Sequence, residues 1–158
     1  LRAQKGTMYE GGLRVPLIAR WPGKIAPGTV TDHVSCFQDM MPTFVELAGG
    51  EVEKPIDGIS MVPTLLGEPD NQKQHEFLYW ERAGINTLRA GDMKGIWFTK
   101  RKKGADFELY NLKDDIAESN NLAEKNPEIV ARMKEIMLGE HADTPSTTWQ
   151  PPAKPIRP

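Results

Sequence analysis

The feature that most constrains the fold is a series of four short apolar segments in the second half of the chain. Turn-forming residues, among them Gly84, Gly91 and Gly104, separate each segment from the next. Short strands joined by such turns pair with their sequence neighbours in an antiparallel sheet. We therefore predict a four-stranded antiparallel meander, with strands at residues 77–81, 86–89, 95–100 and 107–111.

A helix is predicted to follow the fourth strand. Asn126, Pro127 and Glu128 form a helix start, with a capping residue, a proline at the first position and an acid in the first turn. We expect one apolar face of this helix to pack on the sheet, formed by Ile129, Val130, Met133, Ile136 and Met137. The Pro-rich residues 144–158 have too few apolar side chains for a core and are predicted to run extended over the surface.

The first 70 residues follow another pattern. Residues 15–19 and 31–36 are typical of short strands, and the first of these is expected to be buried. Asp39 is a suitable N-cap for a helix that runs to Leu47. Residues 68–74 lack apolar periodicity, so we interpret them as a surface connection between two parts of the chain.

Composition disfavours several classes of protein. The 158 residues carry 20 Lys and Arg against 22 Asp and Glu, whereas a nucleic-acid binder needs clustered excess basic residues. No apolar run approaches the ~20 residues of a membrane-spanning helix. The single cysteine excludes an internal disulfide and a Cys-rich zinc site. We therefore expect neither nucleic acid nor a membrane as a partner.

The strongest site candidate is the glycine-rich segment at residues 5–16. Gly11 and Gly12 predict a tight loop. On such a loop Lys5 can approach an anion closely, because little side-chain bulk blocks the ligand. A solvated lysine is the commoner role for an isolated residue of this type. Glu10 and Arg14 are expected to pair across the loop and fix its shape.

The histidines and the cysteine give no second site. His33, His75 and His141 lie far apart in sequence, and none forms a metal-binding pair at helical spacing. Cys36 has no lysine or arginine near it in sequence, so a buried, unreactive thiol is expected. The sequence therefore predicts no metal ligands in this chain.

Two further groups have alternative interpretations. Trp80 and Arg82, at a strand end, could face a carbohydrate, and a tryptophan buried in a small lobe is the alternative. The basic run at residues 100–103 is typical of a solvated hairpin tip. Its alternative role is an anion-binding patch for a sulfated or phosphorylated polymer.

The glycine-rich segment also carries a family resemblance. Lys-Gly-Thr-Met-Tyr-Glu-Gly-Gly-Leu-Arg-Val-Pro, at residues 5–16, closely resembles the signature around the second active-site lysine of the sulfatase family, in the alkaline-phosphatase-like superfamily. Further stretches resemble that family in the same order, at residues 21–24, 39–43, 57–60, 108–112 and 120–123. The resemblance covers the chain up to the Pro-rich tail.

The resemblance implies an α/β fold, of which this chain would form an α+β C-terminal portion. Residues 1–70 would be the last elements of the large catalytic domain. Residues 71–143 would form a smaller subdomain, a four-stranded antiparallel sheet with a packed helix, and 144–158 the tail.

It also implies hydrolysis of sulfate esters by a formylglycine nucleophile beside a divalent cation, usually Ca²⁺. Only Lys5 carries over as a sulfate-contacting group, with Glu10 and Arg14 holding its loop. Cys36 lies outside the C/S-x-P/A-x-R setting of the nucleophile. The nucleophile and the metal ligands are expected upstream of Leu1, so this chain alone should bind no Ca²⁺ and be inactive.

Other interpretations stay open at this point. The superfamily also admits a phosphodiesterase or phosphonate hydrolase, and the chain could instead be a non-catalytic lobe that binds sulfated polysaccharide. The substrate would be a sulfated small molecule or glycan, and family analogy suggests a periplasmic or secreted protein. Because the edge of residues 15–18 would lack a strand partner, we expect it to pair with a second copy or to be disordered.

Overall fold

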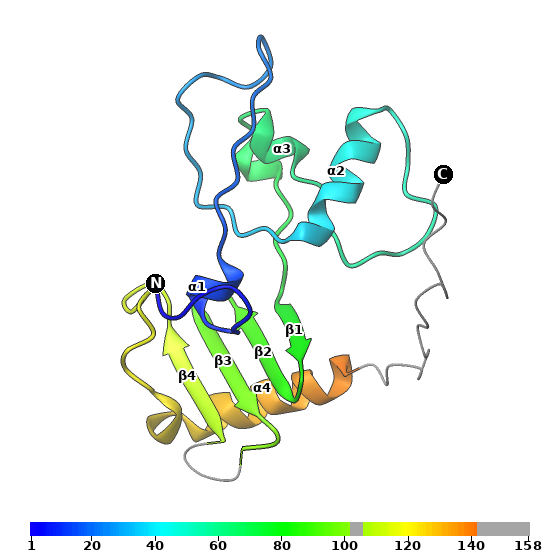
Figure 1. Ribbon diagram of the computed structural model, residues 1–158. Coiled ribbons are helices and arrows are strands. Elements are labelled where there is room, and N and C mark those ends of the chain that lie inside the picture. Colours follow the sequence, from blue (N-terminus) through cyan, green and yellow to red (C-terminus); the bar gives the residue numbers. More distant parts are fainter. Residues whose placement is uncertain (102–105, 142–158) are drawn as a thin grey trace, which may run out of the picture.

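The described part of the chain is an α+β fold in which a small sheet lies beside a helical segment (Figure 1). The structure is a computed structural model, and it describes residues 1–101 and 106–141. The helices are α1 (Glu10–Leu13), α2 (Met40–Leu47), α3 (Val62–Leu65) and α4 (Pro127–Glu140), and short 3₁₀ turns lie at Phe37–Asp39, Pro69–Asn71 and Ala123–Lys125. The strands are β1 (Leu78–Arg82), β2 (Ile85–Ala90), β3 (Met93–Phe98) and β4 (Phe107–Asn111).

The predicted four-stranded antiparallel sheet is confirmed. Its strands lie in the order β1-β2-β3-β4, and each pairs with its sequence neighbour. The third strand begins at Met93, two residues before the predicted start, because the turn at Gly91 is tighter than the sequence indicates. Register places Thr87 opposite both Trp80 and Ile96, and Ile96 opposite Glu108. These four side chains therefore form one row across one face of the sheet.

Helix α4 covers the other face, as predicted. Leu88, Phe107 and Leu109 of the sheet are buried against Met133 and Met137 of the helix. In Figure 1, α4 runs behind all four strands. Proline at the first helical position and Glu128 in the first turn match the expected helix start, although the Asn126 side chain forms no capping hydrogen bond.

The N-terminal segment with α1 covers the opposite face of the sheet (Figure 1). Met8 is buried here against Ile96, Tyr110 and Leu112, with Leu13 packed at the edge of the cluster. The sheet is therefore covered on both faces, by α4 on one side and by the glycine-rich segment on the other.

The predicted strands at residues 15–19 and 31–36 are wrong. Residues 14–36 contain no strand, and the side chains of Val15 and Ile18 are 77% and 90% exposed. A strand needs a neighbour for its backbone groups, and none lies beside these residues within the described ranges. The pairing of this edge with a second copy stays a prediction.

The helical segment, which contains α2 and α3, resembles the prediction with one difference. Helix α2 ends at Leu47, as expected, and Asp39 is its N-cap residue, but the Asp39 side chain does not cap α2. It accepts hydrogen bonds from the Cys36 and Ile59 backbone amides instead. In the described part of the chain, no helix has the length and apolarity needed to span a membrane. The predicted extended tail lies outside the described residues.

One glycine in β3 makes the packing of the sheet on α4 testable. A Cβ atom at Gly95 would lie 2.6 Å from the Phe107 ring and 2.7 Å from the Met133 sulfur. We expect Gly95→Ala to lower the free energy of unfolding by about 1–3 kcal/mol, measured by urea denaturation, because the core cannot take the extra methyl group. Gly139→Ala, in α4 with open space around it, should be neutral or stabilising by up to about 1 kcal/mol. Equal effects of the two substitutions would contradict this packing.

Candidate functional site

Lys5 lies on a tight loop formed by the first residues of the chain. The backbone turns at Gly6, which has a φ of 90°, and the Lys5 side chain is exposed. The Gly11 amide donates to the Arg2 carbonyl at 2.9 Å and closes the loop. The prediction of a tight loop is therefore confirmed, and an exposed lysine is available at its outer turn.

The structure shows why glycine is required at positions 11 and 12. A Cβ atom at Gly11 would lie 2.4 Å from the Arg2 carbonyl oxygen, and one at Gly12 would lie 2.2 Å from the Thr7 carbonyl oxygen. Neither residue has a positive φ. Close approach of backbone to backbone, and not an unusual backbone angle, therefore excludes a side chain at both positions.

A buried lysine joins this loop to the sheet. Lys94, in β3, is fully buried, and its Nζ lies 2.8 Å from Glu10 Oε1 and 2.8 Å from Glu118 Oε1. The Glu10 backbone amide donates to Glu118 Oε2 at 2.7 Å. One ammonium thus links α1, β3 and the loop after β4, and the two carboxylates share its charge.

The predicted pair of Glu10 and Arg14 is a secondary contact. Arg14 Nη1 lies 3.8 Å from Glu10 Oε2, and the arginine side chain is exposed. Because the exposed guanidinium is screened by water, the buried Lys94 is the stronger partner of Glu10. The sequence pattern did not single out Lys94.

A second polar network fixes the start of the loop. Glu108 Oε2 accepts hydrogen bonds from the Tyr9 and Tyr110 hydroxyls, both at 2.8 Å. Arg2 donates to the Tyr110 hydroxyl and stacks over the Tyr9 ring at 3.9 Å. Burial alone would raise the pKa of Glu108, but the hydrogen bonds from Tyr9, Tyr110 and Arg101 and the charge of Arg2 hold this pKa below its usual value.

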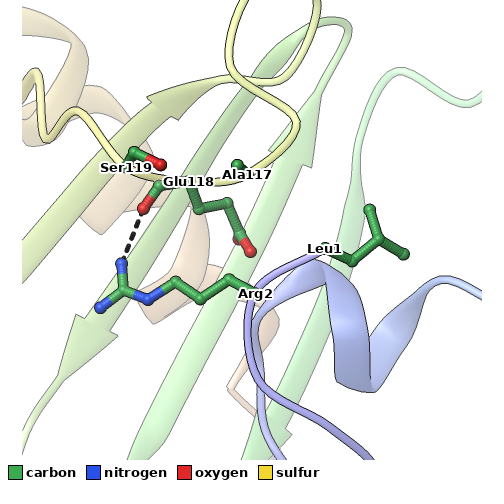
Figure 2. A pocket seen from close by; sticks show the side chains of 5 residues that line it. All are labelled: Leu1, Arg2, Ala117, Glu118 and Ser119. Carbon is green, nitrogen blue, oxygen red and sulfur yellow. Dashed lines mark hydrogen bonds between the residues drawn. The ribbon is translucent and has the colours of Figure 1, made fainter.

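Arg2 also lines a pocket beside this network. The pocket, of about 370 Å³, lies between the N-terminus and the loop after β4, and Leu1, Ala117 and Ser119 complete its wall. Figure 2 shows Arg2 reaching across it to the Glu118 carbonyl oxygen, at 2.8 Å. Arg2 thus joins the first loop of the chain to the loop after β4, which also contains Glu118, the partner of Lys94.

Arg82 and Trp80 lie on the same face of the sheet as the Lys5 loop. The Arg82 guanidinium donates to the Gly6 carbonyl, next to Lys5. Trp80 is half-buried and packs against the cluster beneath the loop. The structure thus places Arg82 against the residue next to Lys5, whereas Trp80 is partly buried against the core. The basic run at 100–103 lies partly outside the described residues.

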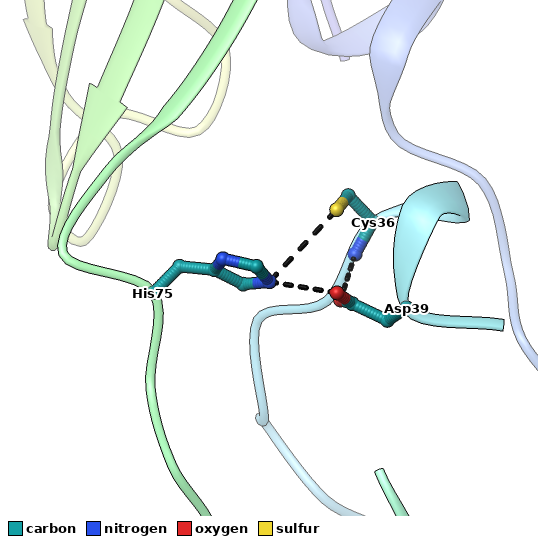
Figure 3. Close-up of side chains that lie close together, drawn as sticks. All are labelled: Cys36, Asp39 and His75. Atoms are coloured by element: carbon teal, nitrogen blue, oxygen red, sulfur yellow. Dashed lines mark hydrogen bonds and ion pairs between the residues drawn. The ribbon is translucent and has the colours of Figure 1, made fainter. Parts of the chain in front are cut away.

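The structure also forms a group that the sequence did not predict, from Cys36, Asp39 and His75 (Figure 3). His75 Nε2 lies 2.8 Å from Asp39 Oδ1 and 3.9 Å from Cys36 Sγ. Burial and the nearby Asp39 raise the pKa of the Cys36 thiol to about 11, so the free thiol is a poor nucleophile at neutral pH. Thirty-six residues separate His75 from Asp39, and only the fold brings them together.

The buried lysine makes a strong stability prediction. Lys94→Met is expected to lower the free energy of unfolding by about 3–5 kcal/mol, because Glu10 and Glu118 would stay buried without a counter-charge. Lys134 pairs with the exposed Asp106 at 2.9 Å, and Lys134→Met should change stability by less than about 1 kcal/mol. Urea denaturation of both variants measures the difference. A Lys94→Met effect no larger than that of Lys134→Met would contradict the buried linkage.

The lowered pKa of Glu108 predicts a pH dependence. In the pH range between the folded and unfolded pKa values, the unfolded chain binds more protons at Glu108 than the folded chain does, so stability rises with pH. The contribution of Glu108 is therefore complete above the usual pKa of 4.5 and is lost as the pH falls through the lower folded value. Glu108→Gln should destabilise the chain at pH 7 by on the order of 1–3 kcal/mol, and by less at pH 3. An equal loss of stability in Glu108→Gln at pH 7 and at pH 3 would contradict the lowered pKa of Glu108.

Comparisons with known proteins agree with the resemblance in sequence. A sequence model described as N-sulphoglucosamine sulphohydrolase, C-terminal, matches residues 3–143. Arylsulfatase A of Homo sapiens is 34% identical over 165 residues, which cover 87% of this chain and 32% of the human protein. A sulfatase of Formosa agariphila is 36% identical over 143 residues, or 80% of this chain and 26% of that protein.

A solved structure shows the same fold. A protein in complex with its substrate D-glucosamine-2-N,6-O-disulfate superposes with a TM-score of 0.65 at 29% identity, and the match covers 84% of this chain and 30% of that one. This chain thus spans about a third of the length of the relatives that it matches. From the family signature, the sequence identity and the shared fold, the chain belongs to the sulfatase family and corresponds to the C-terminal part of its members.

Proposed function

We propose that this chain is the C-terminal part of an enzyme that hydrolyses sulfate esters, in which Lys5 binds an oxygen of the sulfate group. The observation that carries the proposal is the exposed Lys5 on a loop held by buried ion pairs. The family membership supports the reaction class.

The physical role of Lys5 is electrostatic. Sulfate transfer moves negative charge onto oxygen, and a cation held in place before the reaction stabilises that charge without reorganising. Lys94 supplies the fixed position, because it binds Glu10, the first residue of α1 and five residues after Lys5. Arg82, which contacts the Gly6 carbonyl, adds a second cation on the same face. The pair suits a substrate that carries more than one negative group.

The formylglycine nucleophile and the Ca²⁺ of the family belong to the proposal for the whole protein. A hard cation such as Ca²⁺ takes six to eight oxygen ligands. Among the described residues, the one group of three candidate ligands contains a thiol and an imidazole, so these residues do not fit Ca²⁺.

The substrate class that we propose is a sulfated glycan or a small sulfated molecule. One solved relative binds a disulfated glucosamine, and a curated relative is named an ulvan-active sulfatase. The two cations and the edge of Trp80 on one face of this chain are consistent with an anionic sugar. A phosphodiester substrate is not favoured by any of these relatives.

The exposed apolar residues support a larger assembly around this chain. Val15, Ile18, Val30 and Phe37 are each more than 75% exposed, and exposed apolar surface of this kind marks an interaction site. We propose that the remainder of a sulfatase covers this surface and brings its catalytic groups to Lys5.

Activity measurements test the proposal. In a full-length sulfatase that carries this chain, Lys5→Ala should lower kcat/KM for an aryl sulfate by roughly 100-fold or more, the loss expected when one stabilising group is removed. Lys73→Ala, at another exposed lysine, should leave kcat/KM unchanged. The isolated 158-residue chain should show no turnover.

Two results would overturn the proposal. One is an unchanged kcat/KM in Lys5→Ala with aryl sulfate. The other is faster turnover of a bis-aryl phosphate than of the aryl sulfate by the full-length enzyme, which would favour phosphodiester chemistry.

A further inference from the structure

The group of Cys36, Asp39 and His75 has the chemistry of a transition-metal site. It brings together a thiol, a carboxylate and an imidazole, with one ligand atom from each, and these three atoms lie within 4.8 Å of one another. Figure 3 shows the three side chains converging on a common point from two separate segments. Thiolate and imidazole ligands select Zn²⁺ and exclude Ca²⁺ and Mg²⁺, which prefer oxygen.

The two distances from His75 nearly fit a tetrahedral zinc ion. Zn–S, Zn–N and Zn–O bonds of about 2.0–2.3 Å place the ligand atoms of a tetrahedron roughly 3.3–3.6 Å apart. The observed separations from His75 Nε2 are 3.9 Å to Cys36 Sγ and 2.8 Å to Asp39 Oδ1. A movement of the imidazole by less than about 1 Å, away from the carboxylate, would therefore satisfy both distances.

Hydrogen bonds already orient the carboxylate ligand. Asp39 Oδ2 accepts from the Cys36 backbone amide at 2.7 Å, and Asp39 Oδ1 accepts from the Ile59 amide at 2.8 Å. In known metal sites, hydrogen bonds of this kind orient the side chains that bind the metal. The Asp39 side chain is 1% exposed and the His75 side chain 10% exposed, so water competes little for these ligands.

His75 also borders a pocket of about 210 Å³, which Val34, Phe77 and Arg89 line as well. A water molecule would complete four-coordination. Because His75 lies three residues before β1 and Asp39 directly before α2, an ion here would tie the helical segment to the sheet.

We propose that Cys36, Asp39 and His75 form a Zn²⁺ site that joins the helical segment to the sheet. Binding releases the Cys36 thiol proton to solvent, and His75 carries its proton on Nδ1 so that the Nε2 lone pair faces the ion. Thiolate and carboxylate together then balance the two charges of Zn²⁺. This site is independent of the sulfatase reaction, since it uses neither Lys5 nor its loop.

Metal titration tests the proposal. The 158-residue chain, stripped with a chelator and then dialysed against Zn²⁺, should retain one ion per chain. The Co²⁺ form should show a thiolate-to-cobalt absorption band. Zn²⁺ at a hundredfold excess over its Kd should raise Tm by roughly 5–10 °C. Cys36→Ser should abolish the band, and both Cys36→Ser and His75→Gln should weaken Zn²⁺ binding at least tenfold.

The controls separate a metal site from a hydrogen-bonded cluster. His141→Gln, at an exposed histidine outside the group, should bind Zn²⁺ as the unmodified chain does. The far-UV circular dichroism of each metal-free variant should match that of the unmodified chain, which shows that the substitution leaves the fold intact. Asp39 is left unchanged because its carboxylate holds two backbone amides. Failure of the folded chain to bind Zn²⁺, or full affinity in either variant, would overturn the proposal.

Discussion

The buried ammonium of Lys94 is the interaction on which the arrangement of the site depends. It lies between the carboxylates of Glu10 and Glu118, and all three side chains are withdrawn from water. A buried charge is costly without partners, so the three groups hold one another in a single geometry. That geometry joins the first loop, the third strand and the segment after the fourth strand. These buried contacts hold the loop that carries the exposed Lys5.

The two faces of the sheet make different kinds of contact. Helix α4 packs on one face and supplies the apolar core of the small lobe. The other face combines Met8 and Ile96 with the Lys94 and Glu108 networks. Apolar packing stabilises this second face. The ion pairs fix the position of the glycine-rich segment on it. The exposed side chains of Lys5 and Arg82 lie at its outer edge.

The sequence predicted the sheet and α4 well, because alternating and helical periodicities are local signals. It failed at residues 15–19, whose apolar composition is typical of a strand but whose strand partners are absent from the described residues. It also missed Lys94 and the group around His75. A buried lysine is recognisable only through its acidic partners, and Glu10 lies 84 residues away. His75 and Asp39 are 36 positions apart, so neither cluster leaves a signature in one stretch of sequence.

Amide hydrogen exchange measures whether the buried contacts fix the Lys5 loop on the sheet. The Glu10 amide donates to the buried Glu118 carboxylate at 2.7 Å, so it can exchange only when the loop leaves the sheet. We expect this amide to exchange as slowly as the hydrogen-bonded amides of β3. Exchange of the Glu10 amide at the rate of an exposed loop, while the β3 amides stay protected, would contradict this expectation.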